Sequence, residues 1–138
     1  MKKLILIVLL VIVSTGFAMN LKAVNSKIKY KENNHKETTL KLKLLADKGH
    51  PESQNQLGWI YDQGQGVISN PQKAVEYYLK SANQGFKKAQ INIGVMYEIG
   101  RGVPQDFEEA NKWYLKAEKQ GNNIHKKMSL RNKQRLER

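Results

Sequence analysis

The sequence contains no cysteine, and its 138 residues include only three histidines and three prolines. Without cysteine there are no disulfides, no thiol nucleophile and no thiolate metal site. The histidines, His35, His50 and His125, lie far apart, and no pair of histidines or carboxylates stands at ligand spacing. No Gly-Lys-Ser or Gly-Lys-Thr follows the glycine-rich segments, so a phosphate-binding loop is not expected either. The sequence therefore predicts no metal and no cofactor.

A catalytic constellation is also missing from the sequence. Ser69 and Ser81 have no histidine close to them in the chain to act as a base. Glu108 and Glu109 fall at the start of a predicted helix, where two carboxylates favour the positive end of the helix dipole. Because no nucleophile, base and orienting residue can be assembled, we predict that the protein is not an enzyme.

The only long apolar run lies at the N-terminus. Two lysines precede ten apolar residues, 4–13, and the small residues Gly16 and Ala18 follow. This layout predicts a signal peptide over residues 1–18, cleaved after Ala18, and hence export, most simply to a bacterial periplasm. The alternative is an uncleaved anchor in the inner membrane, although a spanning helix needs about 20 apolar residues.

Positive charge is abundant but confined to the flanks of the chain. The total is 24 lysines and arginines against 12 acidic residues, yet residues 49–123 are neutral. Residues 19–48 and 124–138 each carry a net charge of +5. We expect a mobile basic lead-in over 19–34 and a basic tail over 124–138, and anionic lipid or cell-wall polymer is a more plausible partner than nucleic acid. Solvated flanks without a partner remain the alternative.

The central region is an internal repeat. A shift of 36 residues makes 12 of the 36 positions in 49–84 identical to their partners, including Gly58 with Gly94 and Tyr78 with Tyr114. A period of this length is typical of stacked helical repeats. Each unit reads as two helices, with loop glycines between them, and the second helix is capped by Asn70 or Asp106. The glycine inside each first helix predicts a close approach of a neighbouring helix backbone.

The predicted fold is all-α, an α-solenoid of antiparallel helix pairs. The repeat domain covers 35–123 and contains a half repeat followed by full repeats at 50–85 and 86–121. Glu118 replaces the alanine found at Ala82, which predicts a more exposed final helix that caps the array. Ile124, Met128 and Leu130 are expected to lay an apolar edge on the last repeat.

The fixed positions of the repeat resemble the Sel1-like repeat, a relative of the tetratricopeptide repeat. The resemblance covers 46–121 and is carried by Leu57, Gly58, Tyr61, Gly64, Gly66, Val67, Ala74, Tyr78, Ala82, Gln84, Gly85 and Ala89, with a second copy through Gly94, Tyr97, Gly100, Gly102, Val103, Ala110, Trp113, Tyr114 and Ala117. It implies an α-solenoid that binds other proteins. Small exported members of this family include neutralising partners of secreted toxins, a role that the motif does not encode, and this chain lacks the paired cysteines of a secreted subgroup.

A partner-binding face is predicted from the positions that vary between the two repeats. Trp59 corresponds to Val95, and an aromatic residue on a variable face is a reasonable anchor for a protein partner. The alternative places Trp59 beneath the leading helix around Leu44. The predicted face comprises Asn55, Trp59 and Asp62 with their equivalents Ile91, Val95 and Glu98, and it would be concave.

We therefore expect an exported protein that binds another protein through this face, more specifically as an inhibitor or immunity partner of a toxin that acts in the bacterial envelope. The alternative is an envelope accessory protein that its basic flanks hold on anionic lipid or cell-wall polymer. So short an array also leaves a homodimer formed by end-to-end stacking open.

Overall fold

The structure is a computed structural model that describes residues 34–121 and 123–137. The predicted signal peptide and nearly all of the lead-in lie outside the described residues. The chain divides into two compact units, residues 1–36 and 37–138, and every element below belongs to the second unit. The described residues form helices and turns without a strand, which confirms the all-α prediction. No helix among them is long and apolar enough to cross a membrane.

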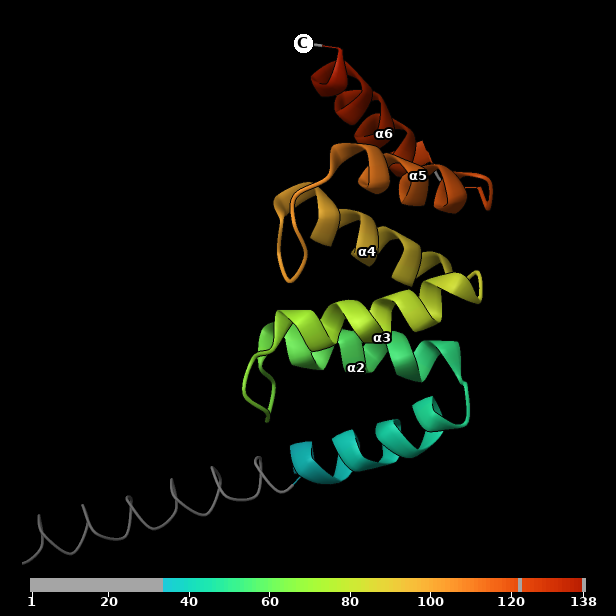
Figure 1. Cartoon of the computed structure of the whole chain (residues 1–138). Helices are drawn as coiled ribbons and strands as arrows, with labels where there is room; N and C mark the ends of the chain where they lie inside the picture. The colour runs from blue at the N-terminus through green and yellow to red at the C-terminus, as the bar shows by residue number, and fades with distance from the viewer. Residues whose placement is uncertain (1–33, 122, 138) are drawn as a thin grey trace, which may run out of the picture. The chain divides into compact units, whose positions relative to one another are not determined.

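A row of helices builds the second unit (Figure 1). Its first element is a leading helix, which the described residues show over 34–47 and of which 37–47 belong to this unit, and five further helices follow. These are α2 (Pro51–Gln63), α3 (Pro71–Asn83), α4 (Lys87–Ile99), α5 (Phe107–Glu118) and α6 (Asn123–Leu136). Each helix from α2 to α5 packs on the next one in the chain. This stacking confirms the predicted α-solenoid.

Caps and left-handed glycines set the ends of the helices. Asn70 and Asp106 accept hydrogen bonds from backbone amides three residues later, at 3.0 Å and 2.9 Å, and so cap α3 and α5. Gly64 and Gly100 end α2 and α4 with φ of +69° and +68°. Side chains other than glycine rarely adopt this conformation, so the predicted need for glycine in these loops is confirmed.

Two apolar clusters form the core. The larger runs from α3 to α5, and Tyr78 and Ile93 belong to it. The smaller joins the leading helix to α2 and α3 through Ala46, Leu57 and Tyr77. Since each cluster draws on at least three successive helices, no helix pair encloses a core of its own, as stacked repeats require.

A tyrosine fills the space left by each helical glycine. A Cβ on Gly58 would lie 2.6 Å from the Tyr78 ring, and one on Gly94 would lie 2.5 Å from the Tyr114 ring. The predicted close approach is therefore real, but it involves a side-chain ring and not a helix backbone. Within each repeat, the glycine of the first helix accommodates the tyrosine of the second.

The region expected as a basic tail forms most of helix α6, which packs on α5. Its first residue follows that of α4 by 36, just as α4 follows α2, so α6 occupies the place of the first helix of a third repeat. Glu118 is more exposed than Ala82, as expected, but α5 does not end the array because α6 follows it. Leu130 is 53% exposed, so its predicted packing is wrong. Met128 is half-buried, and the Ile124 side chain is not among the described ones.

Candidate functional site

The predicted face lies on α2 and α4, the first helices of the two repeats. Trp59 is 45% exposed, and Leu44 on the leading helix is more exposed still. Burial of Trp59 beneath that helix is therefore not what the structure shows. Ile91 and Val95 are half-buried on α4. Of the six predicted residues, Trp59 offers the largest accessible apolar side chain.

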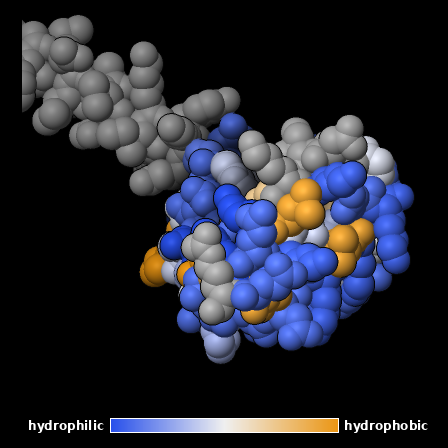
Figure 2. Space-filling view, turned by 90° about the horizontal axis from the view of Figure 1, so that it is seen from above, coloured by the Kyte–Doolittle hydropathy of each residue, from blue (hydrophilic) through white to orange (hydrophobic). Residues whose placement is uncertain are grey.

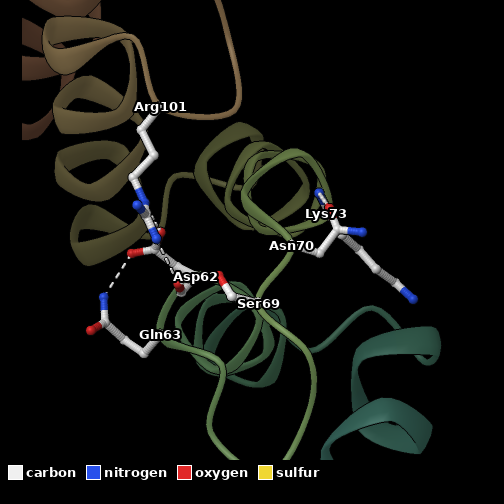
Figure 3. A network of polar contacts seen from close by, with 6 residues as sticks. All are labelled: Asp62, Gln63, Ser69, Asn70, Lys73 and Arg101. Carbon is white, nitrogen blue, oxygen red and sulfur yellow. Dashed lines mark hydrogen bonds and ion pairs between the residues drawn. The ribbon is translucent and has the colours of Figure 1, made fainter.

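The polar residues of the face join one repeat to the next. Asn92 Nδ2 on α4 donates a 2.9 Å hydrogen bond to Asn55 Oδ1 on α2. Arg101, in the loop after α4, donates from Nε to Asp62 Oδ1 at 2.5 Å and from Nη2 to the Asp62 carbonyl at 2.8 Å (Figure 3). Two hydrogen bonds to one residue fix the guanidinium, so Asp62 is a junction between repeats as well as a member of the face.

The end of α2 is held by further contacts around Asp62. Ser69 Oγ donates a 3.0 Å hydrogen bond to the Asp62 carbonyl, and Gln63 Nε2 donates to Asp62 Oδ2 at 2.9 Å (Figure 3). Nearby, Lys73 lies 4.4 Å from the centroid of the Tyr61 ring. A hydrogen bond to Tyr61 raises the pKa of Lys73 above its ordinary value and keeps the ammonium charged.

Glu98 occupies the position of Asp62 one repeat later, but its surroundings are more enclosed. Only 6% of Glu98 is exposed. Its carboxylate accepts hydrogen bonds from the Tyr114 hydroxyl at 2.8 Å, from Arg131 and from Arg135 at 3.3 Å. The two arginines come from α6, so this helix covers this part of the predicted face.

Burial and the neighbouring carboxylate affect Tyr114. Desolvation raises the pKa of its hydroxyl well above the ordinary tyrosine value, and the hydrogen bond to Glu98 raises it further. Burial likewise raises the pKa of Tyr78, to which the Asp62 carboxylate adds. Both hydroxyls therefore stay protonated at any physiological pH, and neither is a candidate base.

A ladder of glutamines runs along the repeats. Gln54 Nε2 donates to the carbonyl of Ala46, and Gln90 Nε2 donates to the carbonyl of Ala82. Each of these glutamines in turn accepts from the glutamine 30 residues later, Gln84 at 2.7 Å and Gln120 at 3.0 Å. The sequence repeat matches Gln54 with Gln90 and Gln84 with Gln120, but the hydrogen bonds of Gln84 to Gln54 and of Gln120 to Gln90 are visible only in the structure.

Polar and cationic side chains take part in the packing of α6 on α5. Ser129 Oγ donates to Asn111 Oδ1 at 2.5 Å, and the Arg135 guanidinium lies 5.1 Å from the centroid of the Phe107 ring. Asn132 is fully buried, and neither of its amide atoms has a hydrogen-bond partner among the described residues. The sequence analysis missed this interface because residues 122–138 share no identity with the residues 36 positions earlier.

No group of three or more histidine, cysteine or acidic residues within the described ranges could hold a metal ion. His50 is exposed at the start of α2, and the side chain of His125 lies outside the described ones. What the face offers is an exposed aromatic side chain beside ordered polar groups. Such an arrangement can bind a protein surface, since aromatic anchors supply much of the binding energy at interfaces.

Helix pairs that recur at a constant period and share a continuous core define the class: this is an α-solenoid repeat protein. The chain belongs to the Sel1 repeat family, because the family model described as Sel1 repeat matches residues 51–86 and 87–122, about half of the sequence. No curated protein matches it. Proteins built from Sel1 repeats generally bind other proteins and are typically scaffolds without enzymatic activity.

Solved structures agree with this assignment. The c5321 protein of uropathogenic Escherichia coli, a protective antigen with an SLR fold, is 36% identical over 63% of this chain and 19% of its own, with a TM-score of 0.62. A Sel1 repeat protein from Oxalobacter formigenes is 43% identical over 59% of this chain and 34% of its own, with a TM-score of 0.57. The chain thus spans only about a fifth and a third of these two proteins.

The cysteine-rich protein B of Helicobacter pylori is similar over a larger part of its length. It covers 78% of this chain and 92% of its own, at 20% identity and a TM-score of 0.65. At this identity the likeness concerns the fold alone. The same architecture is therefore formed here without any cysteine.

Proposed function

We propose that this protein binds another protein through a surface centred on Trp59, defined by Asn55, Trp59, Asp62, Ile91 and Val95. The observation that carries the proposal is the exposure of Trp59, 45%, on a helix whose other large apolar residues, Leu57 and Ile60, are buried. An exposed tryptophan on a rigid helix costs little entropy on binding and offers a large contact area.

The polar neighbours of Trp59 favour this proposal, because hydrogen bonds within the protein already fix their side chains in the absence of a partner. Asn55 is bonded to Asn92, and Asp62 is bonded to Arg101. A surface held in one conformation loses less freedom on association, which favours affinity. The mechanism is recognition by a preformed surface, without covalent chemistry.

The finer proposal concerns where the protein acts. The layout of residues 1–18 favours export to the bacterial periplasm, and a small exported repeat protein suits the role of an inhibitor or immunity partner of a toxin that acts in the envelope. If the partner is such a toxin, the purified protein should reduce its activity in proportion to the amount added, up to a fixed stoichiometry.

A pull-down from envelope extract tests the binding surface. The protein without residues 1–18 would be immobilised and washed at low salt and then at about 0.5 M salt, where exposed ion pairs are largely screened. One protein retained at high salt and lost on Trp59→Ala is the expected result. Ile68→Ala is the matched control, because Ile68 is 92% exposed in a loop outside the surface.

A second candidate rests on the basic flanks. Lys126 and Lys133 of α6 are exposed, and residues 124–138 carry a net charge of +5. This charge favours association with anionic lipid or cell-wall polymer. In that case binding should disappear in the high-salt wash, survive Trp59→Ala and weaken on Lys126→Gln with Lys133→Gln, which is the opposite pattern to that of the first proposal.

A further inference from the structure

Helix α6 has the register of a first helix but not its core residues. At the positions of Leu57 and Ile93 it carries Ser129, and at those of Ile60 and Met96 it carries Asn132. All four apolar residues are buried in α2 and α4, and both polar residues are buried in α6. At these two positions α6 therefore lacks the apolar contacts that help to hold α2 and α4 in the array.

Asn132 makes this docking costly. None of its surface is exposed, and its amide nitrogen and oxygen have no partner within the described part of the chain. In the detached helix both atoms would be hydrated, so docking gives up hydrogen bonds to water and replaces none of them. The hydrogen bond that Ser129 donates to Asn111 offsets the cost of burying the Ser129 hydroxyl.

Charge contributes to the attraction that holds α6. Arg131 and Arg135, one helical turn apart, both donate to the Glu98 carboxylate, and Arg135 also lies over the Phe107 ring. Both arginines remain about half exposed and would be readily hydrated after release, while Glu98 is almost fully enclosed. Release of α6 would therefore be more unfavourable for the enclosed Glu98 carboxylate than for the two arginines, unless another cationic helix took its place.

We propose that α6 is a displaceable helix, and that the surface beneath it, named here the Glu98 groove and formed by Glu98, Phe107 and Asn111, binds an amphipathic helix of a partner protein. The partner helix carries two arginines one turn apart and apolar residues at the positions of Ser129 and Asn132. It gains the charge contacts of α6 without the cost of a buried amide. The groove is separate from the surface centred on Trp59 and does not depend on it.

The place of α6 in the array makes such an exchange possible. It is the last of the described helices, and α5 is the helix on which it mainly packs (Figure 1). Figure 2, seen from above the α6 end, shows a largely hydrophilic surface with separate hydrophobic areas. No described helix beyond α6 would have to move when it leaves.

Peptide binding to the full chain tests the proposal. The probe is a fluorescent peptide with the sequence of residues 123–137 that carries Ser129→Leu and Asn132→Met. We expect it to bind at least about tenfold more tightly than the unmodified peptide, a difference of about 1.4 kcal/mol. A third peptide with the same apolar changes and Arg131→Gln with Arg135→Gln should lose this gain, because it cannot pair with Glu98.

Two protein variants and one structural readout complete the test. Because Glu98→Gln removes the charge contact of α6 as well as that of the peptide, its expected effect is that the apolar peptides with and without the two arginines bind this variant equally. The protein with Ser129→Leu and Asn132→Met in its own α6 should not bind the peptide, because its α6 then packs more tightly and is not displaced. Hydrogen exchange on the wild-type complex should show that α6 loses protection when the peptide binds.

Three results would overturn the proposal. They are failure of the apolar peptide to bind, binding that leaves α6 fully protected, and equal binding of the peptides with and without arginine. Sedimentation of the full chain tests whether a second copy occupies the groove. A dimer that exchanges α6 between copies would assign the groove to a second copy and not to a partner protein. Failure here leaves the Trp59→Ala result unaffected, so the two proposals are judged separately.

Discussion

The hydroxyl of Tyr114 on α5 donates a 2.8 Å hydrogen bond to Oε2 of Glu98 on α4, and the same carboxylate receives two arginines from α6. One side chain thus connects three successive helices. In the preceding repeat, Asp62 receives Arg101, so an acidic residue at the end of each first helix accepts a cation from the next unit. The Glu98 contacts lead to the first prediction.

Glu98→Gln should loosen α6 and leave the rest of the array in place. Glutamine can still accept from Tyr114 but loses the charge that attracts Arg131 and Arg135, so we expect a loss of about 1–3 kcal/mol in the free energy of unfolding. Urea unfolding measures the loss, and hydrogen exchange should place it in α6. Glu108→Gln is the matched control, because Glu108 is exposed and its removal should cost less than about 0.5 kcal/mol.

Gly58→Ala should destabilise the protein although alanine favours helices. The new methyl would stand 2.6 Å from the Tyr78 ring, and overpacking of this kind costs about 1–3 kcal/mol, against a gain of about 1 kcal/mol in helix propensity. Urea unfolding of Gly58→Ala, Tyr78→Leu and the double variant tests the contact. The double variant should be more stable than the sum of the two losses predicts, and strict additivity would contradict the steric explanation.

Arg101→Gln should weaken the junction between the two repeats. Arg101 donates to both the side chain and the backbone of Asp62, whose side chain is only 13% exposed, so we expect a loss of about 1 kcal/mol. Because Asp62 is sheltered, the loss should persist in salt. Lys112→Gln removes the exposed pairs with Glu108 and Glu109 and should have a smaller effect that salt abolishes. Equal salt sensitivity in both variants would argue against a fixed junction.

Stability should fall as the pH rises above 10. The pKa values of Tyr78 and Tyr114 are raised in the folded state from the ordinary 10.0, so above that pH the unfolded chain releases protons that the folded chain keeps. The unfolded state then gains stability, while below pH 10 the two tyrosines contribute no pH dependence. Urea unfolding at about pH 9 and about pH 11 measures the slope, and Tyr114→Phe should flatten it. A slope that Tyr114→Phe leaves unchanged would show that other groups cause it.

The sequence predicts the repeat region well for a physical reason. Gly58 and Tyr78 recur one period later as Gly94 and Tyr114, because the tyrosine ring packs against the glycine in each repeat. Loop glycines such as Gly64 recur because their φ is positive. Constraints of this kind leave identical residues at a fixed spacing. The sequence alone therefore suffices to predict the solenoid and its helix pairs.

Helix α6 could not be predicted in the same way. Its backbone keeps the period, but Ser129 and Asn132 stand where an apolar pattern would have revealed a buried face. Leu130, at the position of Gly94, has no tyrosine of a second helix to accommodate among the described residues, so a larger side chain is tolerated there and is left exposed. No pattern in the sequence predicts the contacts of Glu98 with this helix.

The candidate surface was predictable only in part. Trp59 stood out because its partner in the next repeat, Val95, is so different, and this difference located an exposed aromatic side chain. The pairing of Asn55 with Asn92 depends on how two first helices approach each other, which a single sequence does not specify.

The glutamine ladder has a consequence for the way copies of the chain meet. Within the array, Gln90 and Gln120 join the two helices of a repeat, and the corresponding positions at the two ends of the described array are Lys126 on α6 and Lys48 after the leading helix, both exposed. Two copies stacked in the register of the repeat would bring these ammonium groups together, and like charges in direct contact are unfavourable. In this register the two lysines therefore disfavour end-to-end stacking of two copies, the arrangement by which repeat arrays with complementary ends could form fibres.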